Sequence, residues 1–364
     1  MRVIEQSVPR LPAPESHRRF ELAVLPGDGI GAEVVEMAVR VLGVVEHRLE
    51  GVEFDFNELQ AGAGEYLRSG DPLPEGVFAA CRRADAVLLG PMGLPEVRWP
   101  DGLELTPQID LRERLDLYCG LRPIRLFAPA DSPLKRPGLI DFLLVRENTE
   151  GLFSARHQAR SHRDEAFDTL RVTRRGSERV FRAAFREARR RRHKVTLVDK
   201  ANVLPSMVFF RAVFDEVARE FPDVETERVY VDAAALLLLQ CPARFDVLVT
   251  ENMFGDILSD LAASLVGGMG LAPSADIGEQ SAVFTPAHGS APDLIGKGIA
   301  NPVAMILSAA MLLEWLGTPE TRRGASLVRG AVEATLRDPA KRTPDLGGRL
   351  TTRAMADCIV AALE

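Results

Sequence analysis

Short apolar runs rich in β-branched residues alternate along this chain with longer stretches in which apolar residues recur at helical spacing. The short runs predict buried strands at Glu21–Pro26, Ala84–Gly90, Asp141–Val145, Lys194–Val198 and Asp246–Thr250. The longer stretches predict helices at Ala32–Glu50, Ser177–Arg192, Ser206–Phe221, Asp256–Val266, Pro302–Gly317 and Arg322–Arg337. Strands that alternate with helices form βαβ units, so we expect an α/β fold with a largely parallel sheet covered on both faces.

Length and composition limit the class of protein. A chain of 364 residues suggests two domains or one large α/β unit, and 46% hydrophobic with 27% charged residues is an ordinary globular mixture. With 45 Lys and Arg against 52 Asp and Glu, the net charge is −7, which gives no general attraction to nucleic acid or to an anionic membrane. No apolar run approaches the roughly 20 residues of a membrane span.

The N-terminal segment and the cysteines favour a cytoplasmic protein. Residues 1–20 lack the apolar core of a signal peptide and are predicted to form a Pro-rich tail. Cys81, Cys119, Cys241 and Cys358 lie far apart and show no CxxC spacing. We therefore expect reduced thiols rather than a disulfide framework or a zinc ribbon.

Two short motifs suggest nucleic-acid or nucleotide binding, but their chemistry argues against it. The basic run 189–194 (RRRRHK) follows a predicted amphipathic helix, where cations suit the helix dipole, so we prefer a helix end to a nucleic-acid signal. Gly27–Ala32 (GDGIGA) fits the loose dinucleotide pattern, but Asp28 would repel a pyrophosphate. We predict a tight glycine turn that binds no phosphate, although it can still line a site.

Carboxylates at helical spacing form the first candidate site. Asp256 and Asp260 are four residues apart in TENMFGDILSD, so on a helix they share one face and repel each other unless a cation lies between them. Mg²⁺ or Mn²⁺ suits such oxygen ligands. Asp232, at the end of a strand-like run (VYVDAAA), could complete the metal shell. The alternative is a solvated pair of aspartates with no ligand.

Cations supply the opposite half of this candidate site. Arg112, Arg122 and Arg146 could bind a small dicarboxylate through bidentate forks, although a surface salt bridge is the usual fate of a single arginine. Arg146 follows a predicted strand, where ligand sites gather in open α/β sheets. Lys200 ends another strand, and near a metal and several arginines its pKa should fall, which would make it available as a base. It could otherwise be an ordinary solvated side chain.

Taken together, the ordered motifs resemble those of the β-decarboxylating dehydrogenases, which include isopropylmalate, isocitrate, homoisocitrate, tartrate and D-malate dehydrogenases. The resemblance extends from Leu22 nearly to the C-terminus. Besides the two arginines ten residues apart, it rests on LPGDGIG, ADAVLLG, VRENTEG, DKANVL, YVDA, NMFGDILSDL, HGSAPDLIGKGIANP and TPDLGG. Each motif is weak alone, but the ordered set is specific.

The resemblance implies roles for the candidate residues. Arg112, Arg122 and Arg146 would clamp the carboxylates of a 2-hydroxy diacid. Asp232, Asp256 and Asp260 would hold Mg²⁺ or Mn²⁺, which polarises the hydroxyl as a Lewis acid. Lys200, with Asp232 beside it, would accept the hydroxyl proton as hydride leaves for nicotinamide. Because family active sites are shared across a homodimer, Lys200 and Asp232 should reach the arginines of the second subunit.

The cofactor implied by the resemblance is NAD. It would lie along His288, Gly289, Ser290, Ala291 and Asp293, and against Asn301. Asp293 can accept hydrogen bonds from a free ribose diol but would repel a 2′-phosphate. Relatives that use NADP have a cation and a tyrosine where this chain has Asp293 and Leu294, so NAD is favoured over NADP.

Three positions depart from the family pattern. Phe153 replaces the tyrosine that ends the VRENTEG motif and normally protonates the enolate after carbon dioxide leaves. Gln108 replaces a leucine of the isopropylmalate enzymes and suits a polar substituent, unless it faces solvent. Thr285 replaces a glutamate common near the nicotinamide. The enzyme could therefore protonate through water, oxidise without efficient decarboxylation, or be a catalytically weak relative.

The leading hypothesis is an NAD- and Mg²⁺- or Mn²⁺-dependent dehydrogenase for a malate-type 2-hydroxy diacid, such as 3-isopropylmalate, tartrate or D-malate. The alternatives are isocitrate or homoisocitrate as substrate, or a regulatory or binding subunit with little turnover because of Phe153. By family analogy two α/β domains enclose an active-site cleft. Residues 21–117 and 268–364 would form a discontinuous cofactor-side domain, and residues 118–267 a central domain with the dimer contact.

Overall fold

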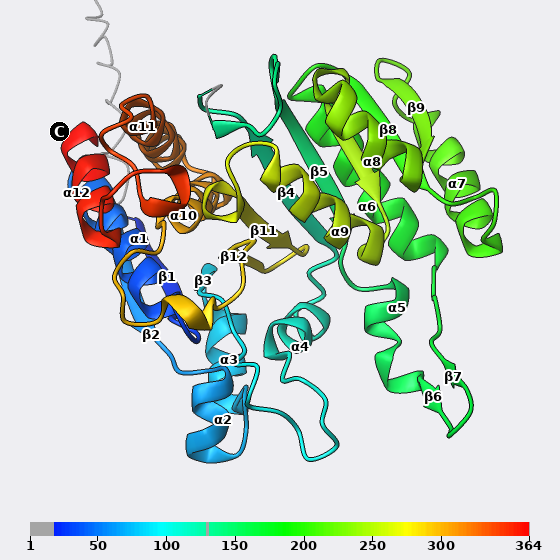
Figure 1. Ribbon diagram of the computed structural model, residues 1–364, viewed down its shortest axis with the longest axis horizontal. Coiled ribbons are helices and arrows are strands. Elements are labelled where there is room, and N and C mark those ends of the chain that lie inside the picture. The colour runs from blue at the N-terminus through cyan, green and yellow to red at the C-terminus, as the bar shows by residue number, and fades with distance from the viewer. Residues whose placement is uncertain (1–17, 129–130, 364) are drawn as a thin grey trace, which may run out of the picture.

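A mixed β-sheet runs through the molecule in the computed structural model, which describes residues 18–128 and 131–363 (Figure 1). Within these residues the main sheet has ten strands. In spatial order they are β2 (Val52–Glu58), β1 (Arg18–Leu25), β3 (Ala86–Leu89), β12 (Ala282–Pro286), β11 (Pro273–Ile277), β4 (Cys119–Arg125), β5 (Asp141–Glu147), β10 (Val247–Thr250), β8 (Lys194–Asp199) and β9 (Glu225–Tyr230). A separate short hairpin pairs β6 (Arg160–Ser161) with β7 (Ala166–Phe167).

Helices cover the sheet on both faces (Figure 1). They are α1 (Gly31–Glu46), α2 (Ala63–Ser69), α3 (Glu75–Arg83), α4 (Pro107–Arg114), α5 (Gly151–Ser154), α6 (Arg174–Arg189), α7 (Pro205–Ala218), α8 (Val231–Gln240), α9 (Asn252–Ser264), α10 (Val303–Leu316), α11 (Pro319–Leu336) and α12 (Thr352–Leu363).

The sheet consists of two parallel parts joined by antiparallel strands. The neighbours β2, β1, β3 and β12 are parallel to one another, as are β5, β10, β8 and β9. Between them, β12, β11, β4 and β5 pair antiparallel. The first parallel part draws its strands from both ends of the chain, and the second from its middle. The prediction of a largely parallel sheet is therefore confirmed for both outer parts, and the antiparallel centre is an addition to it.

Strands buried on both faces explain the apolar runs of the sequence. On β5, Leu143 and Val145 pack with α6 and α7, whereas Phe142 and Leu144 pack with α8 and α9 on the other face. The first parallel part is built in the same way, with α1, α10, α11 and α12 on one face and α3 and α4 on the other. Burying each of these large apolar side chains contributes roughly 1.5–3 kcal/mol.

All the predicted strands and helices are present, with ends shifted by up to four residues. The shifts are largest for the first helix, which ends at Glu46, and for α9, which begins at Asn252. Strand β1 begins at Arg18, inside the predicted tail, and residues 1–17 lie outside the described part of the chain. One local prediction is wrong: Asp232 does not end a strand, because β9 stops at Tyr230 and Asp232 lies in the first turn of α8.

The basic run 189–194 lies at the end of a helix, as predicted. Helix α6 ends at Arg189, and β8 begins at Lys194. The arginines are paired with acidic side chains of the same chain: Arg189 with Asp223, Arg190 with Glu187, and Arg191 with Asp246. These ion pairs occupy the cations that a nucleic-acid site would need.

The free cysteines agree with the reduced thiols expected from their wide spacing in the sequence. The four cysteines are free, and Cys81 and Cys119 are buried. Within the described residues, no helix combines the length and apolarity that a membrane crossing requires. The cytoplasmic location stays a prediction.

The GDGIG turn after β1 forms hydrogen bonds with two other segments of the same chain. The carboxylate of Asp28 is buried and accepts hydrogen bonds from three backbone N–H groups, those of Ala63 at 2.8 Å, Gly64 at 2.9 Å and Gly93 at 2.7 Å. Gly29 has φ +63°, and a Cβ there would come within 2.0 Å of the carbonyl oxygen of Ser290. The motif is therefore a structural turn that joins α2 and the segment after β3, as the chemistry of Asp28 suggested.

Replacing Asp28 by alanine should lower the free energy of unfolding by about 2–4 kcal/mol, because three buried N–H groups lose their acceptor. Urea denaturation measures the change. Asp71→Ala is the matched control, since exposed Asp71 accepts a single backbone hydrogen bond, from Leu73. It should cost no more than about 1 kcal/mol. Equal losses for the two variants would contradict this account of the turn.

Candidate active site

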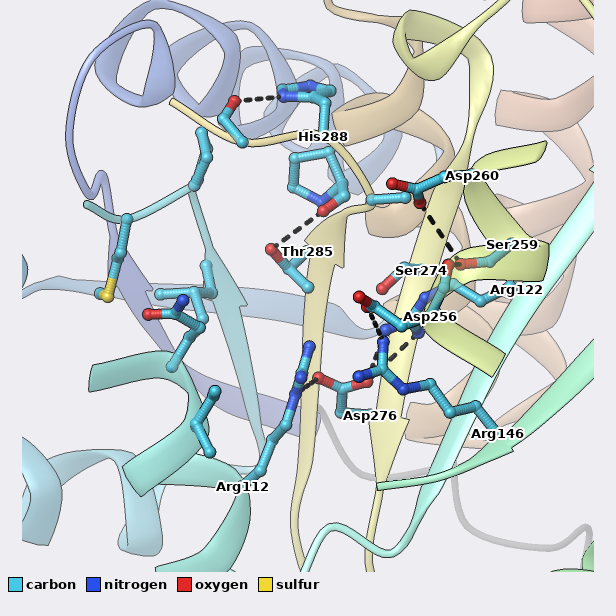
Figure 2. A pocket seen from close by; sticks show the side chains of 18 of the residues that line it. Arg112, Arg122, Arg146, Asp256, Ser259, Asp260, Ser274, Asp276, Thr285 and His288 are labelled. Carbon is cyan, nitrogen blue, oxygen red and sulfur yellow. Dashed lines mark hydrogen bonds and ion pairs between the residues drawn. The ribbon is translucent and has the colours of Figure 1, made fainter. Parts of the chain in front are cut away.

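A cavity of about 280 Å³ lies between the two parallel parts of the sheet, where β3, β4, β5, β11 and β12 meet α4 and α9 (Figure 2). Most of the side chains predicted from the sequence for substrate, metal and nicotinamide converge on it. They are Gln108, Arg112, Arg122, Arg146, Asp256, Asp260, His288 and Gly289. The chain thus brings its candidate arginines and carboxylates together from four separate segments, α4, β4, β5 and α9.

Arg146 is held at the carboxyl end of β5 by the start of α9. Its Nε and Nη2 atoms donate to Oδ1 of Asn252 at 2.9 and 2.7 Å, and Nη1 forms an ion pair with Asp256. The helix can approach because residue 255 is glycine: a Cβ there would lie 2.7 Å from Cγ of Arg146. Burial, with nearby Arg112 adding to it, lowers the pKa of Arg146 to about 10, so the guanidinium stays protonated at neutral pH.

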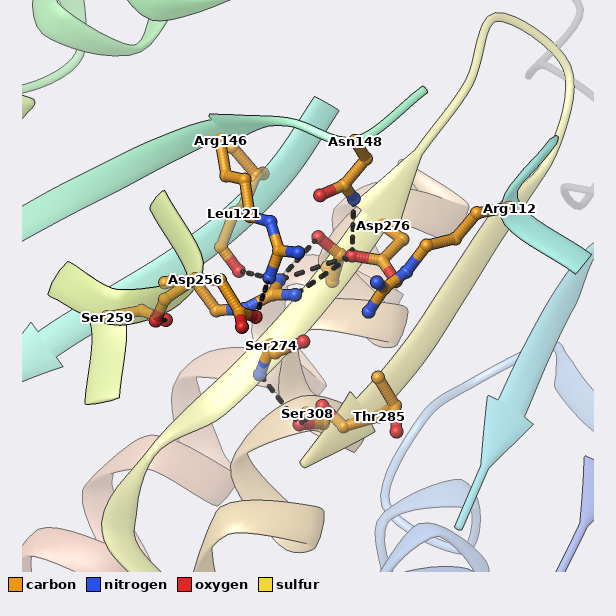
Figure 3. Close-up of polar contacts among 12 residues, drawn as sticks. Arg112, Leu121, Arg146, Asn148, Asp256, Ser259, Ser274, Asp276, Thr285 and Ser308 are labelled. Carbon is orange, nitrogen blue, oxygen red and sulfur yellow. Dashed lines mark hydrogen bonds and ion pairs between the residues drawn. The ribbon is translucent and has the colours of Figure 1, made fainter. Parts of the chain in front are cut away.

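Arg112 and Arg122 share a carboxylate that the sequence interpretation did not include, that of Asp276; Figure 3 shows Arg112 and Asn148 beside it. Asp276, on β11, accepts from Nε of Arg112 at 2.6 Å and from both terminal nitrogens of Arg122 at 3.2 Å. Asn148 donates to the same carboxylate at 2.8 Å. Burial alone would raise the pKa of Asp276, but Arg112 and Arg122 outweigh it and hold the pKa well below its usual value. The site therefore contains a permanent internal anion.

Three residues of this network were missed: Asp276, Asn148 and Asn252. A single acidic residue in the apolar segment 271–277 (LAPSADI) was the available signal for Asp276, because a buried carboxylate requires a cation or several donors. The two asparagines lie within the motifs VRENTEG and NMFGDILSDL, but only the folded chain shows which groups they orient.

Asp256 and Asp260 form the candidate metal position. Both line the cavity from successive turns of α9 (Figure 2). Partial burial and the neighbouring Asp256 carboxylate raise the pKa of Asp260, as expected for a half-buried carboxylate beside a like charge. Such an oxygen pair fits a divalent hard cation. Within the described residues, no three acidic, histidine or cysteine side chains are placed so that they could hold one metal ion together, and Asp232 does not line this cavity, so one chain offers two of the three predicted ligands.

Lys200 and Asp232 lie together but away from this cavity. Lys200 follows β8, and its Nζ forms an ion pair with Asp232 in the first turn of α8. The hydrogen bond from Lys200 lowers the pKa of Asp232. The side chain of Asp232 is 66% exposed, so the pair faces outward from its own chain. The structure thus separates the predicted base and third metal ligand from the arginines of the same chain.

Uncharged polar groups form the rest of the cavity wall. Gln108 lines the cavity rather than facing bulk solvent, and Thr285 and Ser274 lie opposite each other on β12 and β11. Buried atoms without a hydrogen-bond partner within the described residues include Oε1 of Gln108, Oγ of Ser274 and Nε2 of His288. Buried polar atoms are normally satisfied, so these three are available to a ligand.

The segment between β12 and α10 carries the predicted cofactor residues. Burial lowers the pKa of His288; Nδ1 of its neutral ring donates to the carbonyl of Gly289 at 2.9 Å, which leaves Nε2 as an acceptor. Ser290 is fixed by Ile30, whose N–H donates to its carbonyl at 2.9 Å, and its hydroxyl donates to Gly93. Ala291 adopts a left-handed conformation with φ +41° just before the exposed Asp293.

Asn301 already has partners within the chain. It donates to Asp345 at 3.0 Å and accepts from the N–H of Val303 at 3.0 Å, so it holds the start of α10. Of the predicted cofactor residues, His288 and Gly289 line the cavity. The others lie outside the lining on the same segment: Ser290, Ala291, Asp293 and Asn301.

Phe153 occupies the wall beside Arg146. Its ring centroid lies 5.5 Å from Cζ of Arg146, a cation–π distance. The three tyrosines lie elsewhere: Tyr66 packs on Trp99, Tyr118 on Arg179 and Tyr230 on Arg211. None of them supplies the hydroxyl that Phe153 lacks.

Comparison with known proteins agrees with this geometry. The family model described as isocitrate/isopropylmalate dehydrogenase matches residues 21–359. A 3-isopropylmalate dehydrogenase of Bacillus licheniformis is 44% identical over 94% of this chain and 95% of its own length. An isocitrate/homoisocitrate dehydrogenase of Thermus thermophilus is 44% identical over 95% of this chain and 99% of its own. The crystal structure of isocitrate dehydrogenase from Methylococcus capsulatus superposes with a TM-score of 0.86 at 39% identity, covering 94% of this chain and 99% of that one.

Proposed function

The chain belongs to the isocitrate/isopropylmalate dehydrogenase family, which consists of decarboxylating dehydrogenases acting on hydroxy acids, and from this premise we propose the specific reaction. It oxidises a malate-type 2-hydroxy diacid with NAD as hydride acceptor and Mg²⁺ or Mn²⁺ as metal. The observation that carries the proposal is the convergence of Arg112, Arg122 and Arg146 on one cavity with Asp256 and Asp260. A set of guanidinium groups facing a pair of carboxylates suits a substrate with two carboxylates and an ion between them.

In this proposal different residues orient the substrate, hold the metal and accept the proton. Asn252 fixes the plane of the Arg146 guanidinium, so its fork is oriented before the diacid binds. Asp256 and Asp260 hold the divalent ion, which when bound supplies Lewis-acid polarisation of the substrate hydroxyl. Lys200, in its neutral amine form, would accept the hydroxyl proton at Nζ, and Asp232 would orient that amine through the hydrogen bond that Nζ donates to it.

The separation of Lys200 from the arginines supports a homodimer with shared active sites. Around Lys200 and Asp232, α8, α9 and the segment before α7 expose large apolar side chains. They are Val203, Leu236, Leu239 and Ile257. Such a concentration of exposed apolar groups is typical of an interaction surface. A second copy packed here would bring its Lys200 and Asp232 toward the first copy's cavity.

NAD is the favoured cofactor on the chemistry of the segment after β12. His288 presents Nε2 as a hydrogen-bond acceptor in the cavity wall, and Asp293 places an exposed carboxylate farther along the same segment. A carboxylate accepts from the free hydroxyls of a ribose and repels a phosphate on that sugar. NADP would therefore bind this segment less well than NAD.

Polar side chains in the cavity wall determine which substituent of the substrate fits best. Gln108, Ser274 and Thr285 offer amide and hydroxyl groups where an isopropyl group would leave them unsatisfied. Tartrate and D-malate fit this wall better than 3-isopropylmalate, and isocitrate or homoisocitrate would need Gln108 to contact an extra carboxylate.

One observation favours a second candidate function. Phe153 leaves the cavity wall beside Arg146 without a phenol, so a subunit that binds diacid and nucleotide with little turnover is the alternative. The retained arginines and aspartates favour an active enzyme, because buried charges without a ligand are costly.

A panel of 2-hydroxy diacids with NAD and Mn²⁺ tests the function. We expect NADH formation with at least one of tartrate, D-malate and 3-isopropylmalate, loss of activity on chelation of the metal, and recovery when Mn²⁺ is restored. Absorbance of NADH measures the rate. Diacid binding without turnover on the whole panel would favour the binding-subunit alternative, and turnover that survives chelation would contradict the metal assignment.

A further inference from the structure

Asp276 is an unusual component of a site that binds anions. Its side chain is 3% exposed, and it lines the same cavity as the three arginines (Figure 2). Along β11, Ser274 and Asp276 alternate with Ala275, whose side chain packs into the core on the other face of the sheet. The strand therefore directs both polar residues toward the cavity, and Asp276 forms part of the cavity wall.

The carboxylate changes the charge that the cavity can accept. Arg112, Arg122 and Arg146 carry three positive charges, and Asp276 takes hydrogen bonds from two of these side chains. Whatever charge a bound ion contributes, Asp276 makes the site one unit more negative than the same cavity with a neutral residue at 276. An incoming anion thus meets fewer uncompensated guanidinium charges.

The contacts of Asp276 bring its charge close to a bound ligand. Asp276 accepts from Arg112 at 2.6 Å and from Arg122 at 3.2 Å, so a ligand carboxylate bound by either guanidinium lies within roughly 8 Å of it. Over such distances in a protein interior, one pair of like charges changes an affinity by about 10- to 100-fold. A ligand with a third carboxylate experiences one such repulsion more than a ligand with two.

We infer that Asp276 determines substrate charge: it restricts the site to dicarboxylates and disfavours tricarboxylates such as isocitrate or homoisocitrate. The inference rests on the proposed function and sharpens it, because it separates the diacid hypothesis from the tricarboxylate alternative. Asn148 supports the role by holding the carboxylate in place at 2.8 Å. Asp276 is a specificity-determining residue, and proton transfer is left to other groups.

Binding of two inert anions to the full-length protein tests the inference without turnover. Succinate is a dianion, and tricarballylate has the same backbone with a third carboxylate. Calorimetry with Mg²⁺ present should show wild-type protein binding succinate more tightly. Asp276→Asn, which keeps the shape and one acceptor oxygen, should shift the ratio of the two affinities toward tricarballylate by about 10- to 100-fold. Asp131→Asn is the control, since Asp131 is a buried carboxylate paired with Arg342 outside the cavity. It should leave the ratio unchanged.

The outcomes separate the inference from the function. If succinate binds and the ratio of succinate affinity to tricarballylate affinity is the same in wild type and Asp276→Asn, the charge role is overturned and the proposed function stands. Failure of both anions to bind either protein overturns both. If Asp276→Asn does not fold, Asp276→Ser is measured in its place. On the wild type, the monoamide of tricarballylate should bind about 10- to 100-fold more tightly than tricarballylate. Equal binding of amide and acid would overturn the inference.

Discussion

Replacing Lys200 by methionine should lower kcat by about 10²–10⁴-fold, the usual contribution of a positioned general base. Methionine keeps the length of the side chain and removes the amine that accepts the substrate proton. Diacid affinity should change little, because Arg112, Arg122 and Arg146 bind the carboxylates, whereas Lys200 acts on the substrate hydroxyl. Steady-state NADH production and calorimetry with succinate measure the two effects. Arg228→Met, which removes a cation paired with Asp215 on the outer surface, is the control and should leave kcat unchanged.

Complementation between two inactive variants then tests whether the sites are shared. Arg112→Met should prevent diacid binding in its own cavity, and Lys200→Met should lack the base. In a heterodimer of the two, purified through different affinity tags, one of the two shared sites contains both an intact cavity and an intact lysine. We expect about half of the wild-type activity from it. A heterodimer as inactive as its parents would show that each site is built from one chain.

The parts of the fold that could be predicted are those in which periodicity is strong. Strands such as Val247–Thr250 are buried on both faces and appear in the sequence as continuous apolar runs. Edge strand β2 (VEFDFNE) has charged residues on its exposed positions and was not recognised as a strand, and of edge strand β9 (ETERVY) only the apolar end was recognised as strand-like. The antiparallel centre was missed as well, because β11 and β12 are short and their pairing depends on segments far apart in the chain.

The candidate site shows the same division. The arginines and Asp256 could be assigned because they lie in an ordered set of motifs, and Arg146 lies near the carboxyl end of a strand, where ligand sites gather. Asp276 could not be assigned, since its importance depends on antiparallel pairing of β11 with β4, which brings Arg122 beside it. Asp232 was placed on the wrong type of element because an apolar run of β9 continues directly into α8 without a break in the pattern.

Phe153→Tyr should raise carbon dioxide release relative to NADH formation. Phe153 lines the cavity, and its ring lies 5.5 Å from the guanidinium carbon of Arg146. A phenol there would stand close to a cation, which favours the phenolate and so makes the phenol a stronger acid toward a developing enolate. General-acid groups contribute about 10²–10⁴-fold to a proton-transfer step. If protonation is the step that Phe153 limits, the ratio of the two products should therefore rise toward parity.

The matched variant for this experiment is Phe153→Leu, which removes the aromatic ring and adds no hydroxyl. It should leave the product ratio at the wild-type value, while any change in packing beside Arg146 appears as a change in KM. Carbon dioxide and NADH are measured in the same reaction mixture. A ratio that stays constant in Phe153→Tyr would mean that another group, or water, already protonates the enolate at full rate. A ratio that rises equally in both variants would assign the effect to space in the cavity, because only the tyrosine can donate a proton.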